Sequence, residues 1–446
     1  MELTFGTDGV RGVANVELTA ELVLSLGRAA GSVIPGHKAG TRVVVGVDTR
    51  ISSDMIEAAL CAGLQSAGAD VLRCGVMPTP GVAALVRILG ADAGAVVSAS
   101  HNPAEYNGVK FFSSEGFKLP DEVEERIEQC AAGHGTAMRL PGLLTGRSEW
   151  IQNSVGIYVD NLVQETKVDL KGLKLVIDCA NGAATSVAPE LFRRLGAEVT
   201  LINASPDGLN INAGCGALHP DGMQRAVLAA RAFGGMSFDG DADRVVMADE
   251  VGRVLDGDRM MLLAARRLKA ENALSHDTVV GTVMSNMGLE VALRKADITL
   301  YRAPVGDRYV LEEMKRLGAV LGGEQSGHVI FLNHSTTGDG LQTALQVLAT
   351  AVSAKQPLSA LAADMIDYPQ VLENVRVSGR DRWNKVPAIT EAVEKAKQRL
   401  GTEGRVLIRP SGTEPLLRVM VEGRDLTLVN QIVAELSDLA HKHLRD

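Results

Sequence analysis

The chain has 446 residues. A single hydrophobic core rarely supports a chain of this length, so three or four domains are expected. Hydrophobic residues make up 46% of it and the formal net charge is −9, which is typical of a globular protein and argues against nucleic acid or an anionic membrane as its main partner. Five widely spaced cysteines, no apolar run near the ~18 residues of a membrane span and no leader-like N-terminus favour a reducing, cytoplasmic location.

The first regular pattern along the chain is a strand, a helix and a second strand. Residues 42–47 form an apolar strand, and the second strand begins at residue 69, just after Gly68. Between them, Asp54 and Glu57 have the spacing of a helix N-cap and its capping box. Two parallel strands need a crossover of this kind, so the pattern predicts a βαβ unit and a parallel sheet.

The same order of elements returns twice, at 173–199 and at 279–301. After Pro369 the order changes to a strand, a helix, two strands and a final helix, which is an α+β unit. The sequence therefore predicts an α/β protein in which three similar mixed-sheet α/β domains precede a C-terminal α+β domain. The expected domains are residues 1–150, 151–252, 253–366 and 367–446.

A polar stretch, Ser-Ala-Ser-His-Asn-Pro, follows the apolar strand at 94–97. A hydroxyl at the end of a strand, just before a tight turn, is where α/β proteins expose a nucleophile, and Ser100 has that place. An ordinary Ser/Asn/Pro turn is the alternative, and the stretch taken alone favours it. Further along, Lys110 could offset the charge of a phosphoryl group or move a proton, unless it is merely a solvated side chain.

A loop with alternating carboxylates predicts a metal site. Asp239, Asp241 and Asp243 can turn three oxygen donors onto one hard cation. A calcium EF-hand is excluded, because Arg244 stands where that loop needs glycine and an apolar strand follows. A solvated acidic turn is the other alternative, but three like charges this close need a cation to offset their repulsion. We favour Mg²⁺ with a phosphate oxygen as its next ligand.

The loop at 409–415 has the groups that bind a phosphate. It offers backbone N–H groups beside Gly412, the hydroxyls of Ser411 and Thr413, and the guanidinium of Arg409, and Arg418 follows in the next strand. A plain hairpin turn is an equally good reading of this loop alone. No G-x-x-x-x-G-K-[ST] segment occurs, so ATP as phosphoryl donor has no support.

Two further segments carry polar groups that a ligand could use. The loop at 323–328 offers the Glu324 carboxylate and the Ser326 hydroxyl to sugar hydroxyls, and His328 is more readily structural than catalytic. Near the N-terminus, residues 4–13 are punctuated by glycine and place Arg11 in a loop that approaches another group closely. A hairpin turn with a solvated arginine is the alternative there.

These motifs together resemble the α-D-phosphohexomutase family. The resemblance lies in Thr-Phe-Gly-Thr-Asp-Gly-Val-Arg-Gly, Ser-Ala-Ser-His-Asn-Pro, Asp-Gly-Asp-Ala-Asp-Arg, Gly-Gly-Glu-Gln-Ser-Gly-His and Arg-Pro-Ser-Gly-Thr-Glu-Pro, which occur in family order over nearly the whole chain. It implies four domains around a central cleft, a phosphorylated Ser100, and one Mg²⁺ held by the phosphorylated serine and the three aspartates. Ala242 departs from the family, whose metal loop usually has glycine there; the methyl is tolerable unless the backbone needs a positive φ.

The resemblance also implies an activity. The serine would give its phosphoryl group to one end of a hexose phosphate, and would take the other phosphate back from the bisphosphate intermediate. The segments at 303–310 and 322–328, and the opening Gly-Thr-Asp-Gly-Val-Arg-Gly, are similar to those of family members that act on glucosamine 6-phosphate and glucosamine 1-phosphate. Such an activity would feed amino-sugar nucleotide and cell-wall synthesis. Glucose or mannose phosphates are the alternative substrates. A weakly catalytic binding protein and a phosphomonoesterase are less favoured, and a homodimer is left open.

Candidate site residues follow in two groups. Those considered for catalysis, including the unassigned acid–base step, are Ser100, His101, Lys110, Arg11 and His328. Those expected to hold the sugar phosphate are Arg244, Asp307, Arg308, Glu324, Ser326, Arg409, Ser411, Gly412, Thr413 and Arg418.

Overall fold

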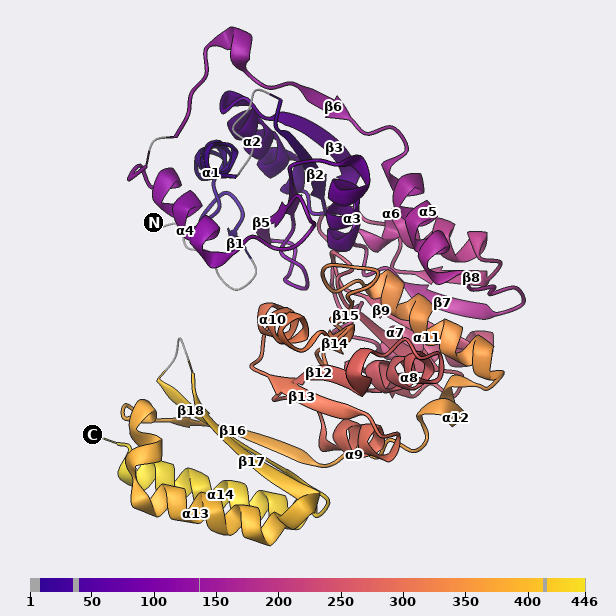
Figure 1. Ribbon diagram of the computed structural model, residues 1–446, viewed down its shortest axis with the longest axis vertical. Coiled ribbons are helices and arrows are strands. Elements are labelled where there is room, and N and C mark those ends of the chain that lie inside the picture. The colour runs from indigo at the N-terminus through magenta and orange to yellow at the C-terminus, as the bar shows by residue number, and fades with distance from the viewer. Residues whose placement is uncertain (1–8, 35–39, 136, 412–414, 446) are drawn as a thin grey trace. The chain divides into compact units, whose positions relative to one another are not determined.

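The computed structural model of the protein describes residues 9–34, 40–135, 137–411 and 415–445. The chain divides into two compact units, one comprising Met1–Met284 with Ala296–Ala363 and the other Ser285–Lys295 with Asp364–Asp446. Over the described residues the first unit contains three sheets and the second contains one (Figure 1).

The three sheets of the first unit share one strand order. Each has three parallel strands beside one antiparallel strand, in the orders β5-β4-β2-β3, β10-β9-β7-β8 and β15-β14-β12-β13. Edge strands β1 and β6 extend the first sheet, and β11 extends the second. The prediction of three similar mixed-sheet α/β domains before a different C-terminal domain is therefore confirmed.

The strands lie within a few residues of their expected places. Those of the first sheet are β1 (Val10–Val13), β2 (Arg42–Val47), β3 (Asp70–Val76), β4 (Ala93–Val97), β5 (Tyr106–Ser113) and β6 (Ser148–Trp150). Those of the second are β7 (Lys174–Asp178), β8 (Glu198–Ile202), β9 (Gly234–Phe238), β10 (Val245–Asp249) and β11 (Val254–Leu255). Those of the third are β12 (Thr278–Thr282), β13 (Thr299–Ala303), β14 (Leu321–Gly323) and β15 (Val329–Phe331).

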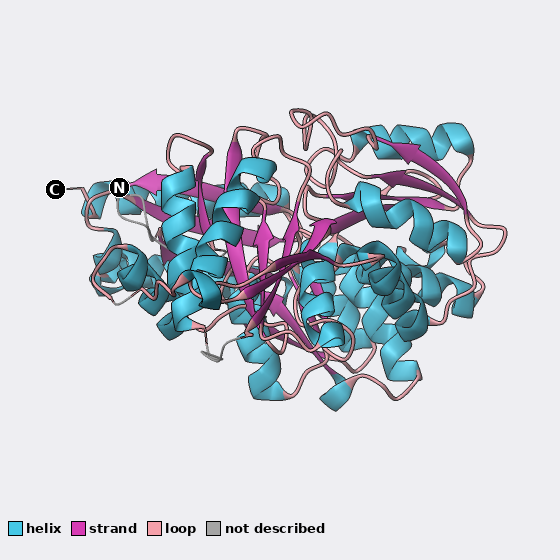
Figure 2. Ribbon diagram, turned by 90° about the horizontal axis from the view of Figure 1, so that it is seen from above, coloured by secondary structure: helices cyan, strands magenta, loops and turns pink. Residues whose placement is uncertain are grey.

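Helices cover these sheets, as Figure 2 shows. The α-helices of the first unit are α1 (Ala20–Val33), α2 (Ser53–Ser66), α3 (Thr79–Leu89), α4 (Asp121–Ala131), α5 (Ser154–Thr166), α6 (Ala184–Arg194), α7 (Asp221–Ala230), α8 (Gly257–Ala270), α10 (Asp307–Leu317), α11 (Gly340–Ala354) and α12 (Leu358–Ala362). No helix among the described residues has the length and apolar character needed to cross a membrane.

Alternate residues of β2 show how the layers pack. Val43 and Val45 belong to the core with α1 and α2, whereas Val44 belongs to the core with α3 and α5. This second core continues through α6, α8 and α11, so one apolar interior runs through all three domains of the first unit. Burial of this extent fixes the ends of the strands relative to one another, and the candidate site lies at those ends.

Two local predictions are wrong. Helix α2 begins at Ser53, so Asp54 lies inside its first turn and is not the N-cap. Glu57 forms no capping box and is instead buried in an ion pair with Arg73 of β3, with Nε 3.0 Å from Oε1. The ion pair with Arg73 in the neighbouring strand thus takes the place of the local capping interaction predicted for Glu57. Arg11 lies in strand β1, paired with β5, and not in a loop.

The second unit is a three-stranded antiparallel sheet with helices packed against it. Its strands are β16 (Gln370–Arg376), β17 (Gly404–Pro410) and β18 (Leu416–Gly423), in the order β16-β18-β17, and its helices are α9 (Met287–Lys295), α13 (Pro387–Leu400) and α14 (Leu426–His443). Buried Glu422 of β18 holds the start of α9 by accepting a hydrogen bond from the Met287 N–H at 2.7 Å. Its other carboxylate oxygen accepts a hydrogen bond from Arg405 Nε of β17 at 2.6 Å. The helix at 287–295 thus packs with the C-terminal strands.

Candidate active site

The candidate residues of the first unit lie on equivalent loops. In each sheet, the loop between the third parallel strand and the antiparallel strand after it carries a predicted motif. That loop holds Ser100 between β4 and β5, the three aspartates between β9 and β10, and Glu324 with Ser326 between β14 and β15. Repetition of one topology therefore puts three motifs on corresponding hairpins.

Ser100 is brought directly against the carboxylate loop. It is fully buried, and its Oγ donates a hydrogen bond to Asp239 Oδ2 at 2.7 Å, across 139 positions of sequence. Its φ of +51° is left-handed, which is uncommon for a residue with a Cβ. The Ser100 N–H donates to Ser98 Oγ at 3.0 Å, and Asn212 Nδ2 donates to the Ser100 carbonyl at 2.9 Å. The surrounding structure thus holds a strained backbone that aims Oγ at the aspartates.

Buried Arg50 supports the same turn, and sequence reasoning missed it. Its five N–H groups all donate to oxygen atoms: Nε to Asp48 at 2.8 Å, Nη1 to the carbonyls of Pro103 and Tyr106, and Nη2 to the carbonyls of Ser100 at 3.0 Å and Asn102 at 2.8 Å. The available signal was an Asp-Thr-Arg segment at the end of strand β2, beside the strand that leads to Ser100. Within its own segment, Arg50 looks like a residue that leads from the strand into helix α2.

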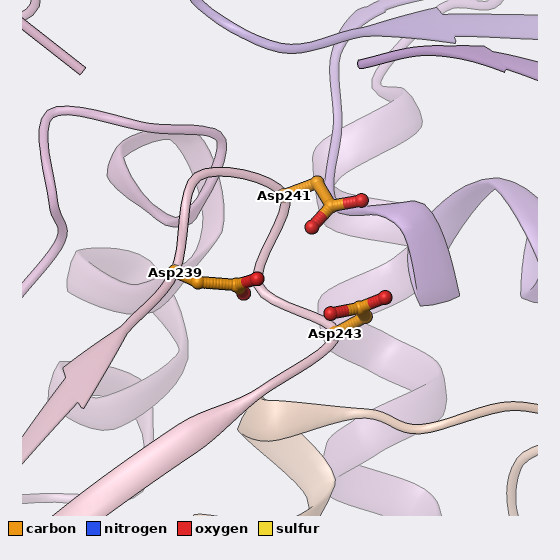
Figure 3. Close-up of side chains that lie close together, drawn as sticks. All are labelled: Asp239, Asp241 and Asp243. Atoms are coloured by element: carbon orange, nitrogen blue, oxygen red, sulfur yellow. The ribbon is translucent and has the colours of Figure 1, made fainter. Parts of the chain in front are cut away.

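The three aspartates form a buried cluster. Asp239, Asp241 and Asp243 each offer a carboxylate oxygen, and these three atoms lie within 4.8 Å of one another. Figure 3 shows the three side chains converging from a single loop. Oδ1 of Asp241 and Oδ1 of Asp243 are buried without a hydrogen-bond partner among the described residues. Orphaned carboxylate oxygens of this kind match the ligands that Mg²⁺ prefers, so the residues present suit such an ion.

Charge within the cluster is unevenly balanced. Burial, together with the negative charges of Asp243 and Asp241, raises the pKa of Asp239 well above its usual range. Burial also disfavours the charged form of Asp243, but the charge of Lys110 and the hydrogen bond from His328 lower its pKa overall. Buried Lys110 lies with Nζ 2.9 Å from Asp241 Oδ2 and 3.6 Å from Asp243 Oδ2. Arg244 Nε is 3.9 Å from Asp243 Oδ1. The Lys110 ammonium and the Arg244 guanidinium together face three carboxylates, which leaves negative charge for a further cation to offset.

Ala242 occupies a backbone conformation that favours glycine. Its φ is +53°, which costs a residue with a Cβ about 1 kcal/mol relative to glycine. Its methyl group is completely buried, and such burial contributes about 0.8 kcal/mol in the opposite direction.

Because these two effects offset each other, Ala242→Gly is expected to change the free energy of unfolding by less than about 1 kcal/mol. Activity should stay the same or rise slightly. Thermal unfolding and kcat, measured side by side on both proteins, test this. A large loss of activity in the glycine variant would mean that the methyl group itself shapes the loop.

His101 lies beside the hydroxyl group of Ser100. Its Nδ1 is 3.4 Å from Ser100 Oγ and 3.4 Å from Nη1 of Arg244. Burial lowers the pKa of His101, and the positive charges of Arg244 and Arg11 lower it further. The imidazole is therefore neutral at pH 7 and has a ring nitrogen that can accept a proton.

His328 is buried beside Asp243 of the carboxylate cluster. Its Nδ1 is 3.7 Å from Asp243 Oδ2, and its Nε2 accepts the Gly338 N–H at 3.1 Å. Burial opposes protonation, but the hydrogen bond to Asp243 and the charges of Asp243, Asp307 and Glu324 raise the pKa of His328 overall.

A cavity of about 450 Å³ brings together three of the predicted substrate-binding residues. Arg244, Glu324 and Ser326 line it, together with Thr282, Met284, Val305 and Gln325. The Glu324 carboxylate is held by the Gly306 N–H at 3.1 Å. A cavity of this size with a few convergent polar groups suits a small polar ligand such as a sugar phosphate.

Asp307 and Arg308 line a different cavity, of about 370 Å³. Asp307 forms an ion pair with Lys118, and its Oδ2 is 3.7 Å from Nε2 of His328. Arg308 donates to Glu124 Oε2 at 2.7 Å. In the structure these two side chains are therefore engaged in ion pairs outside the cavity that Glu324 and Ser326 line.

The second unit carries the predicted phosphate loop. Arg409 of β17 and Arg418 of β18 are direct cross-strand partners, and Ser411 is buried just after β17. Burial lowers the pKa of Arg409, and the charge of Arg418 lowers it further. Like charges on directly opposite strand positions repel each other, and an anion bound beside them would offset that repulsion. Gly412 and Thr413 lie outside the described residues.

Comparison with known proteins identifies the family of the chain. Four family models match the chain in order, described as phosphoglucomutase/phosphomannomutase α/β/α domain I at residues 2–137, domain II at 157–252, domain III at 256–368 and the C-terminal domain at 372–439. The chain belongs to this family. The expected resemblance to the phosphohexomutases is thereby confirmed.

Curated relatives in this phosphohexomutase family are similar over their full length. Phosphoglucosamine mutases from Desulforamulus reducens and Carboxydothermus hydrogenoformans are 50% and 51% identical to the chain, over 98% of it and 99% of each relative. Among solved structures, a phosphoglucomutase/phosphomannomutase family protein from Burkholderia thailandensis is 26% identical, with a TM-score of 0.86 over 100% of this chain and 99% of that one. Aspergillus fumigatus N-acetylphosphoglucosamine mutase shares the fold, with 18% identity and a TM-score of 0.69 over 99% of this chain and 96% of that one.

Proposed function

We propose that this phosphohexomutase interconverts glucosamine 6-phosphate and glucosamine 1-phosphate through a phosphoserine at Ser100 and a bisphosphate intermediate. The observation that carries the proposal is the hydrogen bond of 2.7 Å between buried Ser100 Oγ and Asp239, a member of the carboxylate cluster. Relatives at 50% and 51% identity are named phosphoglucosamine mutase, which supports this choice of sugar.

The site residues would share the work as follows. Asp239, Asp241 and Asp243 would hold one Mg²⁺, with an oxygen of phosphorylated Ser100 as a further ligand. When bound, the ion would offset the charge of about −1.5 to −2 that a phosphoserine carries. Lys110 lies against two of these carboxylates and adds a fixed positive charge to the same region. Phosphoryl transfer depends mainly on such positioning and charge stabilisation.

Each half of the reaction exchanges one P–O bond for another. A sugar hydroxyl attacks the phosphorus of phosphorylated Ser100, the bond from phosphorus to Ser100 Oγ breaks, and the proton of the sugar hydroxyl leaves for a base. Ser100 Oγ takes up a proton, and the bisphosphate turns round before the second half returns the other phosphate to the serine. Four residues are candidates for the acid–base role, namely Arg11, His101, Lys110 and His328.

The remaining candidates would bind the sugar phosphate. Glu324 and Ser326 would hold ring hydroxyls in both orientations, and Arg244 would bind the substrate in the same cavity. Asp307 and Arg308 would contact the substrate by exchanging their present ion pairs with Lys118 and Glu124 for it. The loop after β17, with Arg409, Ser411, Gly412, Thr413 and Arg418, would hold the phosphate that does not react. We propose domain boundaries at 1–150, 151–252, 253–366 and 367–446. A cytoplasmic location is supported by five cysteines that are all buried and unpaired with one another.

The choice of sugar is tested by kcat/KM for each hexose phosphate with purified protein in a coupled assay. A carboxylate directed at the C2 ammonium would favour glucosamine over glucose by about 1.5–3 kcal/mol. We therefore expect a preference of roughly ten- to over a hundredfold for glucosamine phosphate, with residual activity on glucose 1-phosphate. Equal values for the two sugars would contradict the proposed substrate while leaving the family unaffected.

Asp307→Asn locates the carboxylate that recognises C2. A narrower sugar preference in this variant would assign the recognition to Asp307. An unchanged preference would assign it to the residues that line the cavity with Glu324.

Arg409→Ala is expected to raise KM for the sugar phosphate by roughly tenfold or more, because it removes a charge-assisted hydrogen bond that ground and transition states share. The kcat and the phosphate content of Ser100 should change little. Steady-state kinetics and intact-protein mass measure these quantities. Arg424→Ala is the matched control, since it removes an exposed guanidinium of the same unit that pairs with Glu403. An unchanged KM in the Arg409 variant would mean that other residues hold the phosphate.

A further inference from the structure

The first residue of helix α3 reaches from the first domain into the carboxylate cluster of the second. Thr79 donates a hydrogen bond from its hydroxyl to Asp241 Oδ2 at 2.6 Å, and its N–H donates to the Asp241 carbonyl at 2.9 Å. Both side chains are buried, with 1% of Thr79 and none of Asp241 exposed. The two residues are 162 positions apart along the chain, so the contact exists only in the folded protein.

These two bonds fix the direction of the Asp241 carboxylate. Oδ2 is held by the hydroxyl of Thr79 and also lies 2.9 Å from Lys110 Nζ. Oδ1 of the same carboxylate is buried with no hydrogen-bond partner among the described residues. Figure 3 shows one oxygen of Asp241 turned toward the other two aspartates and the second turned away from them. Because a carboxylate is planar, holding Oδ2 and the backbone carbonyl determines where Oδ1 points.

Helix capping does not explain the hydroxyl of Thr79. The N-cap of α3 is Pro78, and no side chain caps the end of this helix. The hydroxyl of Thr79 donates to Asp241 instead. Loss of this hydroxyl would therefore remove no hydrogen bond that caps α3. A methyl group in its place would leave Lys110 as the remaining partner of Oδ2.

We propose that Thr79 is a positioning residue for the metal, which holds Asp241 so that Oδ1 faces the ion. This inference rests on the proposed Mg²⁺ site. The orientation of Asp241 then depends on the first domain, which also supplies Ser100. The hydrogen bonds from Thr79 to Asp241 and from Ser100 to Asp239 would together align the serine with the aspartates. Outer partners that orient a metal ligand commonly change metal affinity by about 10- to 100-fold.

The experiment is a Mn²⁺ titration of metal-free protein, followed by the electron paramagnetic resonance of free Mn²⁺. Thr79→Val removes the hydroxyl, Thr79→Ser retains it, and Thr350→Val is the matched control. Thr350 is also buried, but its hydroxyl donates to the Gln346 carbonyl within α11. We expect Thr79→Val to bind Mn²⁺ about 10- to 100-fold more weakly, and the serine variant and the control to bind like the wild type. If the valine variant does not fold, Thr79→Ala provides the same test.

Kinetics give a second readout that a purely structural role would not change. The concentration of Mg²⁺ needed for half activation should rise in Thr79→Val, whereas kcat at saturating Mg²⁺ should recover most of the wild-type value. Equal Mn²⁺ affinities for the valine variant and the wild type would overturn the role of Thr79. If the wild type itself fails to bind Mn²⁺, the proposed metal site is wrong, which is a separate outcome.

Discussion

Ser100→Ala is expected to lose nearly all mutase activity, on the order of 10⁴-fold or more, because removal of a covalent nucleophile eliminates the route through the phosphoserine. It should also lose the phosphate that a fraction of the purified wild-type protein is expected to carry. Intact-protein mass before and after phosphatase treatment measures the phosphate, and peptide mapping locates it. Only the Oγ atom disappears, and the buried partners of the Ser100 backbone remain in place.

Ser98→Ala is the matched control for the serine substitution. Its Oγ donates to Asp48 Oδ2 at 2.6 Å and accepts the Ser100 N–H at 3.0 Å, so it supports the turn without facing Asp239. We expect a smaller loss of activity and a phosphate still found on Ser100. Full activity in Ser100→Ala, or phosphate located on Ser98, would contradict the assignment of the nucleophile.

Local patterns in the sequence predicted the repeated domains and the principal loops. The strand at 42–47 and the helix after it follow from apolar periodicity, and the same pattern identified the two later copies. Asp239 and its two neighbours stand close together in sequence, so their convergence needed no tertiary information. The strand order adds what the pattern could not, because it shows that the predicted motifs occupy the same hairpin of successive sheets.

The missed residues act over long separations in the chain. Arg50 reaches carbonyls 50 to 56 positions away, Asn212 reaches Ser100 across 112 positions, and Thr79 reaches Asp241 across 162. Each looks locally like an ordinary turn or helix-end residue, and its partner is decided by sheet packing. The capping box at Asp54 failed for the same reason, since a strand neighbour of Glu57 supplied a better partner than the helix end. The grouping of α9 with the C-terminal strands also depends on buried Glu422, far along the chain.

Removal of the metal is expected to abolish activity, and Asp241→Asn is expected to weaken metal binding strongly. Treatment with EDTA should inactivate the wild type, and added Mg²⁺ should restore it. In the variant an uncharged amide replaces a carboxylate whose Oδ1 has no hydrogen-bond partner among the described residues. Loss of a residue that only orients a metal ligand commonly lowers metal affinity by roughly 10- to 100-fold. Loss of the charged ligand itself should lower the affinity for Mg²⁺ by at least as much. Activity should fall in parallel at fixed low Mg²⁺.

Binding can be separated from catalysis through thermal stability. A ligand that binds only the folded state stabilises it by about 2.7 kcal/mol at a hundred times its Kd, so Mg²⁺ should raise the Tm of the wild type and raise that of Asp241→Asn much less at the same concentration. Asp249→Asn is the control, because this buried aspartate ends β10 and accepts backbone N–H groups of its own turn, away from the cluster. Its Mg²⁺-dependent shift should match the wild type. Activity that survives the chelator, or a full shift in Asp241→Asn, would exclude these aspartates as the metal site and would leave the orphaned oxygens unexplained.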